Sequence, residues 1–200
     1  MAVHGGCCTG TDPKVLYKWE LYAMWAFVYV FFVDFFLARG TGEVRAGVLS
    51  GAVAFAVIGM GALGSVLAGT WADRLGRERV TIWAMAVSGA CALLMGWLLH
   101  APLVLVLTVA VVWGFAVVAD SAQFSAVVTE VAPAHAVGTA LTFQTALGFL
   151  LTSVTLTAVP YLRDAGGWPL AFGILALGPA AGIAAMRRLK NLRSAVTSES

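Results

Sequence analysis

Three acidic side chains, Glu20, Asp34 and Asp120, lie in long apolar runs of this 200-residue chain, where an ionised group is costly. Asp120 falls about two helical turns inside one end of its run, and Gln123, three residues later, shares much of its helical face. Glu20 falls near the start of another run. A carboxyl group with little water around it can take up a proton when its surroundings change. We therefore expect Glu20, Asp120 and Gln123 to bind a proton or a small solute, although Asp120 could instead make an interhelical hydrogen bond.

Further polar and aromatic positions follow the helical period. Gln144, Gly148 and Thr155 fall within about 40° of one another on a helical wheel. This spacing predicts a small or polar stripe that lines a central cavity, with Gln144 as a solute ligand. Tyr22 and Trp25 could add an aromatic wall to the cavity, or they could face lipid or pack against other helices.

The composition indicates a membrane protein. Hydrophobic residues make up 60% of the chain and charged residues only 11%, and the mean hydropathy is +0.90. Soluble globular domains carry roughly 25% charged residues, so this chain has too few charges to cover its surface in water. We therefore expect the lipid bilayer as its main surrounding. The net charge of +2, with basic residues in short clusters, argues against nucleic acid as a partner.

Six apolar stretches are each long enough to cross a bilayer as a helix of roughly 20 residues. They are Leu16–Ala38, Ala46–Thr70, Val80–Leu99, Leu103–Val128, Val137–Leu162 and Trp168–Met186. The breaks between them carry turn residues or charges, at 39–42, 69–79, 100–102, 132–135 and 163–167. We predict an all-α membrane protein with six transmembrane helices in an antiparallel bundle. The chain then divides into a polar N-terminal tail (1–15), the six-span domain (16–192) and a C-terminal tail (193–200).

The lysine and arginine residues set the expected orientation. If the six stretches cross alternately, nine of the 12 basic residues fall on one side and three on the other. The larger group is Lys14, Lys18, Arg74, Arg77, Arg79, Arg187, Arg188, Lys190 and Arg193, and the smaller group is Arg39, Arg45 and Arg163. We expect a multi-pass protein of a bacterial-type plasma membrane with both termini in the cytoplasm. Asp34 would then lie at a solvated helix end on the outer side.

The stretch from Gly69 to Arg79 places an acid, a glycine and several bases at fixed spacing between two apolar runs. From the residues alone, Gly76 can supply the positive φ of a tight turn, Gly69 can let a helix end pack closely, and Asp73 can pair with an arginine or a helix N-terminus. The stretch reads G-x-x-x-D-R-x-G-R-x-R and resembles the signature loop of the major facilitator superfamily of secondary transporters. In that superfamily the loop is a conformational latch in which the Asp position is central. The resemblance implies this role for Gly69, Asp73, Arg74, Gly76, Arg77 and Arg79.

A second motif follows the fourth apolar stretch. Glu130, Pro133 and Gly138 match E-x-x-P followed by G-x-A, a pattern of many superfamily members at the loop between the fourth and fifth helices of each half. Those members usually have an arginine just before the glycine, where this chain has Val137.

Small residues recur every four positions in two of the stretches. Gly61, Ser65 and Gly69 do so in the second stretch, and Gly178 and Gly182 do so in the sixth. Because small side chains let helices approach closely, we expect these residues to pack helices together.

The resemblance covers about Leu16 to Leu192, or six of the twelve helices of a full superfamily member, and it implies a C-terminal half. The implied mechanism is alternating access for a small solute, and Glu20 and Asp120 suggest coupling to protons. The chain could be truncated, or it could be a half-size transporter that pairs with a second six-helix half or as a homodimer. The alternative is a non-transporting membrane fragment or assembly partner. The sequence does not identify the solute.

An intramembrane enzyme is the main rival from another class. A membrane serine protease would need G-x-S-G and a histidine deep in another span, but His4, His100 and His135 fall in tails or loops. The sequence has no H-E-x-x-H, and its three cysteines lack the spacing of metal ligands. We therefore predict no enzymatic activity, no metal and no cofactor.

Overall fold

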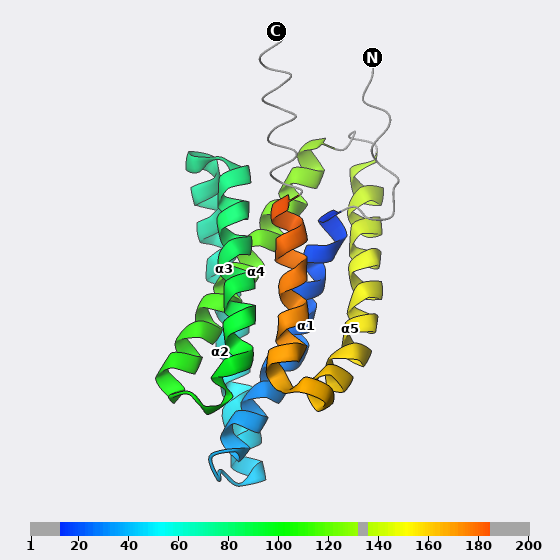
Figure 1. Ribbon diagram of the computed structural model, residues 1–200. Helices are drawn as coiled ribbons and strands as arrows, with labels where there is room; N and C mark the ends of the chain where they lie inside the picture. The colour runs from blue at the N-terminus through cyan, green and yellow to red at the C-terminus, as the bar shows by residue number, and fades with distance from the viewer. Residues whose placement is uncertain (1–12, 132–135, 185–200) are drawn as a thin grey trace.

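The computed structural model describes residues 13–131 and 136–184, and it describes side chains for 20–119 and for 136–184 except 140, 144 and 151. All regular secondary structure in these residues is helical. The elements are α1 (Pro13–Leu37), α2 (Glu43–Leu75), α3 (Arg77–Trp97), η1 (Leu98–His100), α4 (Leu103–Val131), α5 (Val137–Gly173) and η2 (Ile174–Ala176), and residues 177–184 are helical again. Successive helices run in alternating directions (Figure 1). The start of α1, the connection from α2 to α3 and the end of the described chain therefore lie at one end of the bundle, called here the α2–α3 end.

Four segments of the described residues are apolar and long enough to cross a membrane. They are Glu20–Leu37, Glu43–Leu75, Arg77–His100 and Val137–Ala184. The fourth segment contains the predicted fifth span and the predicted sixth span as far as Ala184, and α4 carries a shorter apolar stretch, Leu103–Ala119. The predicted all-α membrane fold is confirmed.

The charged motif is not the loop that the sequence predicted. The helix α2 continues through most of the motif to Leu75, α3 begins at Arg77, and Gly76 alone joins them. Gly76 has φ 89°, which residues with a side chain rarely adopt, and its N–H donates to the carbonyl oxygen of Ala72. The positive φ predicted at this glycine is confirmed. Because one glycine in this conformation reverses the chain, no longer loop is needed.

The turn before the last helical segment also differs from the prediction. The helix α5 continues through residues 163–166, and the backbone leaves helical geometry at Gly167, with φ 72° and ψ −171°. Pro169 follows, and proline suits the first turn of a helix because the N–H it lacks would have no helical partner there. The chain reverses here, and its orange segment returns toward the α2–α3 end (Figure 1).

A cluster of buried aromatic side chains joins three helices inside the bundle. Phe31 of α1 lies edge-on to Trp168, with 5.2 Å between ring centroids, and 5.6 Å from Phe172. Phe172 in turn contacts Trp113 of α4 edge-on at 5.3 Å. Tilted and edge-on ring pairs attract one another beyond the effect of burial alone. The cluster therefore fixes α1, α4 and the last part of α5 as one packed unit.

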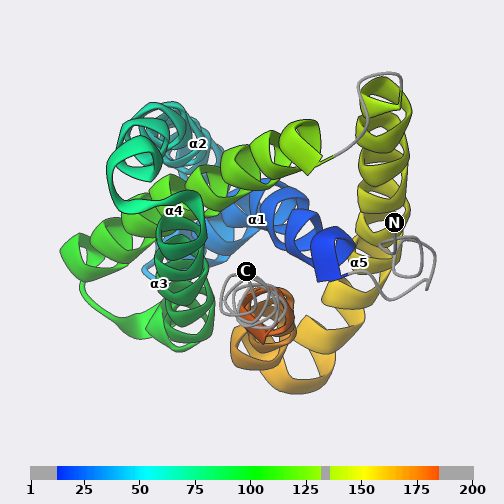
Figure 2. The ribbon, with the colours of Figure 1, turned by 90° about the horizontal axis from the view of Figure 1, so that it is seen from above.

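The helices α2 and α4 cross in close contact, with α4 lying between α2 and the pair α1 and α3 when seen from above (Figure 2). A Cβ atom on Gly64 would overlap the backbone carbonyl of Phe115, and one on Gly114 would overlap that of Val57. Only glycine allows the two backbones to approach this closely. The crossing therefore depends on glycines from both helices.

The packed face of α2 is not the predicted repeat of four. Gly61 is buried against α4, but Ser65 is half-buried, and a Cβ on Gly69 would meet nothing within 4 Å. A strict four-residue repeat drifts by about 40° at each step, so a packed face must mix steps of three and four. The buried small residues do so: Gly61, Gly64, Ala68 and Ala72. In the last helical segment, Gly182 packs against Met85 of α3, as predicted.

Candidate functional site

Glu20 lies inside the bundle and is 1% exposed. Its Oε1 atom accepts two hydrogen bonds, from Ser88 Oγ of α3 at 2.8 Å and from Trp113 Nε1 of α4 at 2.9 Å. Its Oε2 atom is also buried and has no hydrogen-bond partner among the described residues. One carboxyl group from α1 thus meets donors from two other helices and keeps one oxygen unpaired.

The depth of Glu20 differs from the sequence expectation. The sequence placed it near one end of the first span, whereas its partner Ser88 lies 11 residues after Arg77, the first residue of α3. At 1.5 Å per residue this is about 16 Å from the α2–α3 end. Glu20 therefore lies level with the middle of α3, where water is scarce if the bundle spans a bilayer.

The described surroundings of Glu20 provide hydrogen bonds but no compensating positive charge. Among the described side chains, no Lys, Arg or His contacts its carboxyl group. Among the described titratable side chains, Cys91 of α3 lies close enough to interact with the charge of Glu20. A carboxylate in this position depends on Ser88 and Trp113 for stabilisation, and a proton on Oε2 would remove the buried charge altogether.

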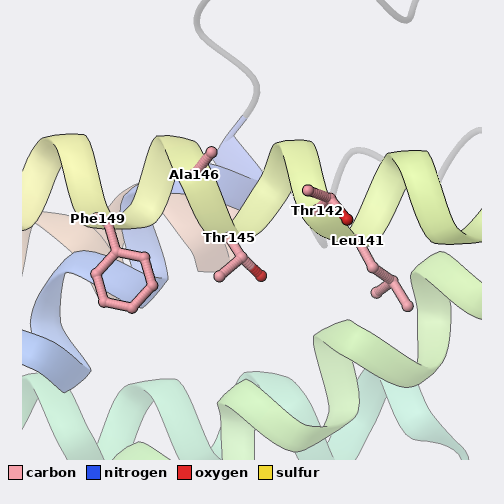
Figure 3. A pocket seen from close by; sticks show the side chains of 5 residues that line it. All are labelled: Leu141, Thr142, Thr145, Ala146 and Phe149. Carbon is pink, nitrogen blue, oxygen red and sulfur yellow. The ribbon is translucent and has the colours of Figure 1, made fainter.

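An open groove of about 430 Å³ lies along the first part of α5 and is lined by Leu141, Thr142, Thr145, Ala146 and Phe149. Figure 3 shows Leu141, Thr145 and Phe149 on the side of α5 that points toward the other helices. These residues are four apart, so they share one helical face. The groove thus offers hydroxyl groups and an aromatic ring, and none of the described residues that line it is ionisable.

A ring stack between α1 and α5 involves Phe149, one of the residues that line the groove. Tyr22 lies nearly parallel to Phe149, with 4.9 Å between centroids and 24° between planes, and edge-on to Trp25 at 5.9 Å. Tyr22 therefore contacts Phe149, a residue of the groove lining, while the role of Tyr22 and Trp25 as a cavity wall stays a prediction. Trp25 is 38% exposed, so part of its ring stays free of protein contacts.

The groove exists because α5 leaves the bundle toward its N-terminal end. On its inward face Gly148, Thr152, Thr155 and Val159 are buried, and the same face is open before Gly148. The expected cavity-lining stripe is therefore wrong for Gly148 and Thr155, which pack α5 against the bundle. The side chain of Gln144 lies outside the described residues.

The comparison with protein families decides the identity of this bundle. Residues 13–190 match the family described as sugar (and other) transporter, within the major facilitator superfamily. The chain belongs to the sugar (and other) transporter family. This family comprises membrane transporters and is not enzymatic. No curated protein gives a significant match.

The motif that carries the superfamily resemblance lies at the α2–α3 end of this transporter-family bundle. Asp73, Arg74 and Arg79 are exposed, and no ion pair within the described residues involves Asp73. Gly69 has open space around it, so the expectation that it allows close helix packing is wrong in this conformation. Arg77 is half-buried, and its carbonyl oxygen accepts a hydrogen bond from Thr81 Oγ1 at 2.7 Å. The motif therefore has exposed charges that are available to other parts of the transporter.

Several predicted site residues cannot be placed by their contacts. The side chains of Asp120, Gln123 and Glu130 on α4 lie outside the described residues, as does Pro133 altogether. Gly138 is exposed in the first turn of α5, and a Cβ there would meet nothing within 4 Å. The roles of these residues stay predictions.

Two residues of the site were missed by sequence reasoning, Ser88 and Trp113. Each is a polar group in the middle of an apolar helix, which is a weak signal, since serine is common at helix contacts and tryptophan in membrane helices. Only the fold brings them to Glu20.

Proposed function

We propose that this chain is a proton-coupled secondary transporter of a small neutral solute of the sugar class, working by alternating access. The observation that carries the proposal is the buried carboxyl group of Glu20, with one oxygen unpaired and no cation beside it among the described side chains. Family membership supports transport, and the site supports the finer points of coupling and solute.

The groove chemistry supports a neutral, polyhydroxylated solute. Its described lining carries no charge, so an ionic solute would lose hydration without compensation. Thr142 and Thr145 bring hydroxyl groups, and Phe149 brings an exposed ring face that can pack on the apolar face of a sugar ring. The family description, sugar (and other) transporter, agrees with this class of solute.

The carboxyl group of Glu20 supports coupling to protons. An ionised group near the middle of a membrane span costs roughly 2.5–3.5 kcal/mol on insertion scales, so such residues are retained for a function. A proton would cancel this cost, and Oε2, the oxygen that Ser88 and Trp113 do not contact, is the one that can accept it. Glu20 is therefore the proposed proton carrier, with Asp120 as a second candidate.

The proposed arrangement in the cell follows from charge and repeat structure. We place the protein in the plasma membrane, with both termini and the α2–α3 end in the cytoplasm, because nine of the 12 basic residues fall on that side if the six predicted stretches cross alternately. Alternating access needs two bundles around a central site, so the six-span unit acts with a second six-helix half or a second copy. Asp73 and its neighbouring arginines form the latch between the two states.

Uptake into proteoliposomes tests the proposal. We expect the full chain to accumulate at least one radiolabelled monosaccharide from a panel when an inward proton gradient is imposed, and to lose accumulation when a protonophore collapses the gradient. Glu20→Gln should abolish gradient-driven accumulation, while Glu43→Gln, the same change at an exposed acid, should not. Accumulation that is unchanged without a gradient would exclude proton coupling. No uptake of any sugar would favour the non-transporting fragment or assembly partner.

A further inference from the structure

One helix connects the buried carboxyl group with the groove. Glu20 and Tyr22 are two residues apart on α1, which corresponds to about 200° around the helix, so they face nearly opposite sides. Glu20 is held by α3 and α4, whereas the Tyr22 ring stacks on Phe149 of α5 at the end of the groove. Any shift of this part of α1 relative to α3 and α4 must therefore change the wall of the groove.

The strength of the hydrogen bonds that Glu20 accepts depends on its protonation state. When the carboxyl group is ionised, the bonds from Ser88 and Trp113 to Oε1 are charge-assisted, and such bonds are roughly twice as strong as neutral ones. When a proton is on Oε2, the same donors face a neutral acceptor. Both contacts are buried, so no water competes with them in either state.

We propose that Ser88 and Trp113 are positioning residues that pin the ionised Glu20 side chain, and with it α1, so that protonation releases α1 and separates Tyr22 from Phe149. This inference rests on the proposed function, because it gives the proton site a way to control access to the solute groove. The donors decide which oxygen is left for the proton, and the opposite face of α1 transmits the change.

The groups around Glu20 restrict which titration can drive this movement. On α3 the neighbouring titratable group is Cys91, and on α4 the side chain of Asp120 lies outside the described residues. Tyr22 and Phe149 respond through the position of α1. When Cys91 is replaced, Glu20 is therefore the described group in this part of the bundle whose protonation can drive the movement of α1.

The distance between α1 and α5 can be measured without knowing the solute. Spin labels at Trp25→Cys and Phe143→Cys, in a full chain with Cys7, Cys8 and Cys91 replaced by alanine, report this distance in liposomes as the pH is varied. We expect two distance populations whose ratio changes with pH. A labelled control pair, Phe55→Cys and Leu94→Cys on α2 and α3, should give a distance that does not change with pH. With Glu20→Gln, the α1–α5 pair should give the low-pH population at every pH.

The positioning residues are tested in the labelled chain. Ser88→Ala and Trp113→Phe each remove one donor to the carboxylate, so each should raise the pH at which the two populations are equal by about one pH unit. Two matched controls should leave this pH unchanged: Ser50→Ala, a buried serine whose hydroxyl has no partner among the described residues, and Trp168→Phe, whose indole donates to Asp34 instead. Because Ser88→Ala removes only one oxygen, it keeps the test valid if Trp113→Phe fails to fold.

The outcomes separate this inference from the proposed function. A distance that does not change with pH, or that changes equally in Glu20→Gln, overturns the inference even if sugar uptake depends on Glu20. A shared shift in Ser50→Ala and Ser88→Ala overturns the role of Ser88. If the distance follows Glu20 as expected while uptake ignores the proton gradient, the switch stands and proton-coupled transport is wrong.

Discussion

Asp34 of α1 and Arg163 of α5 form an ion pair, with 3.4 Å between Oδ2 and Nη1, at the end of the bundle opposite the α2–α3 connection. The same Oδ2 atom accepts a hydrogen bond from Trp168 Nε1 at 3.0 Å. Asp34 is therefore not the freely solvated helix end that its position in the sequence predicted. At the same end, the Arg39 guanidinium donates to the carbonyl oxygens of Leu99, at 3.0 Å, and Ala101. Asp34 of α1 and Arg39, in the turn that directly follows α1, thus contact two other turns at this end of the bundle.

We expect the charge of Asp34 to contribute less to the stability of the fold than its hydrogen bond does. The Asp34 and Arg163 side chains are 33% and 37% exposed, so solvent screens their attraction, and exposed pairs contribute about 0–1 kcal/mol. Asp34→Asn keeps an acceptor for Trp168 and should lower the thermal unfolding midpoint in detergent only slightly. Asp34→Ala removes the acceptor as well and should lower it clearly further. Equal losses in the two variants would mean that the ion pair dominates.

The crossing of α2 and α4 gives a sharper stability test. Gly64→Ala places a methyl group against the backbone carbonyl of Phe115, which cannot move without shifting α4. Such overpacking costs typically 1–3 kcal/mol, so the unfolding midpoint of the purified protein should fall.

Gly59→Ala is the matched control for this crossing. Gly59 lies on the same helix, and an added Cβ would meet nothing within 4 Å. Alanine also has the higher helix propensity, so this variant should be neutral or slightly more stable. A fall of equal size in both variants would show that the close approach of Gly64 to Phe115 is not what the substitution disturbs.

The contrast between these glycines also shows how far a sequence predicts packing. The membrane class, the positions of the helices and the turn at Gly76 follow from hydropathy and from glycine chemistry, which are local properties. The face of α2 that meets α4 depends on how the two helices cross, and it cannot be predicted from the sequence of either helix alone. For this reason the sequence correctly predicts that Gly61 packs against another helix. It does not single out Gly64, and it predicts a contact for Gly69 that Gly69 does not make.

The candidate site also contains residues that the sequence predicts and residues that only the fold reveals. Glu20 could be singled out because a carboxyl group in an apolar run is conspicuous, but its depth could not, because depth is set by the helices beside it. Ser88 and Trp113 become part of the site only through distances across three helices. Tyr22 was predicted as an aromatic wall, and its partner Phe149 is one of many phenylalanines until α5 places it beside α1.

The motif at the α2–α3 end should affect rate rather than affinity. Asp73 is exposed at the end of α2 and is not one of the residues that line the groove on α5, so Asp73→Asn removes no side chain from the groove. If it belongs to a latch between two states, the substitution should lower kcat for sugar uptake and leave KM within about twofold. Initial rates over a range of sugar concentrations in proteoliposomes measure both. A large rise in KM with normal kcat would contradict the latch, and Glu43→Gln serves as an exposed acid that should change neither.

The groove makes the opposite prediction, a loss of affinity with little change in stability. Phe149 lines the groove and is 54% exposed, so Phe149→Ala removes a ring face without emptying a buried cavity. A stacking contact contributes about 0.5–1.5 kcal/mol, which corresponds to a rise in KM of about two- to tenfold. Phe143→Ala is the control, because Phe143 lies on the same helix, is 65% exposed and does not line the groove. If both substitutions raise KM equally, the effect comes from general changes in α5, and the solute does not bind beside Phe149.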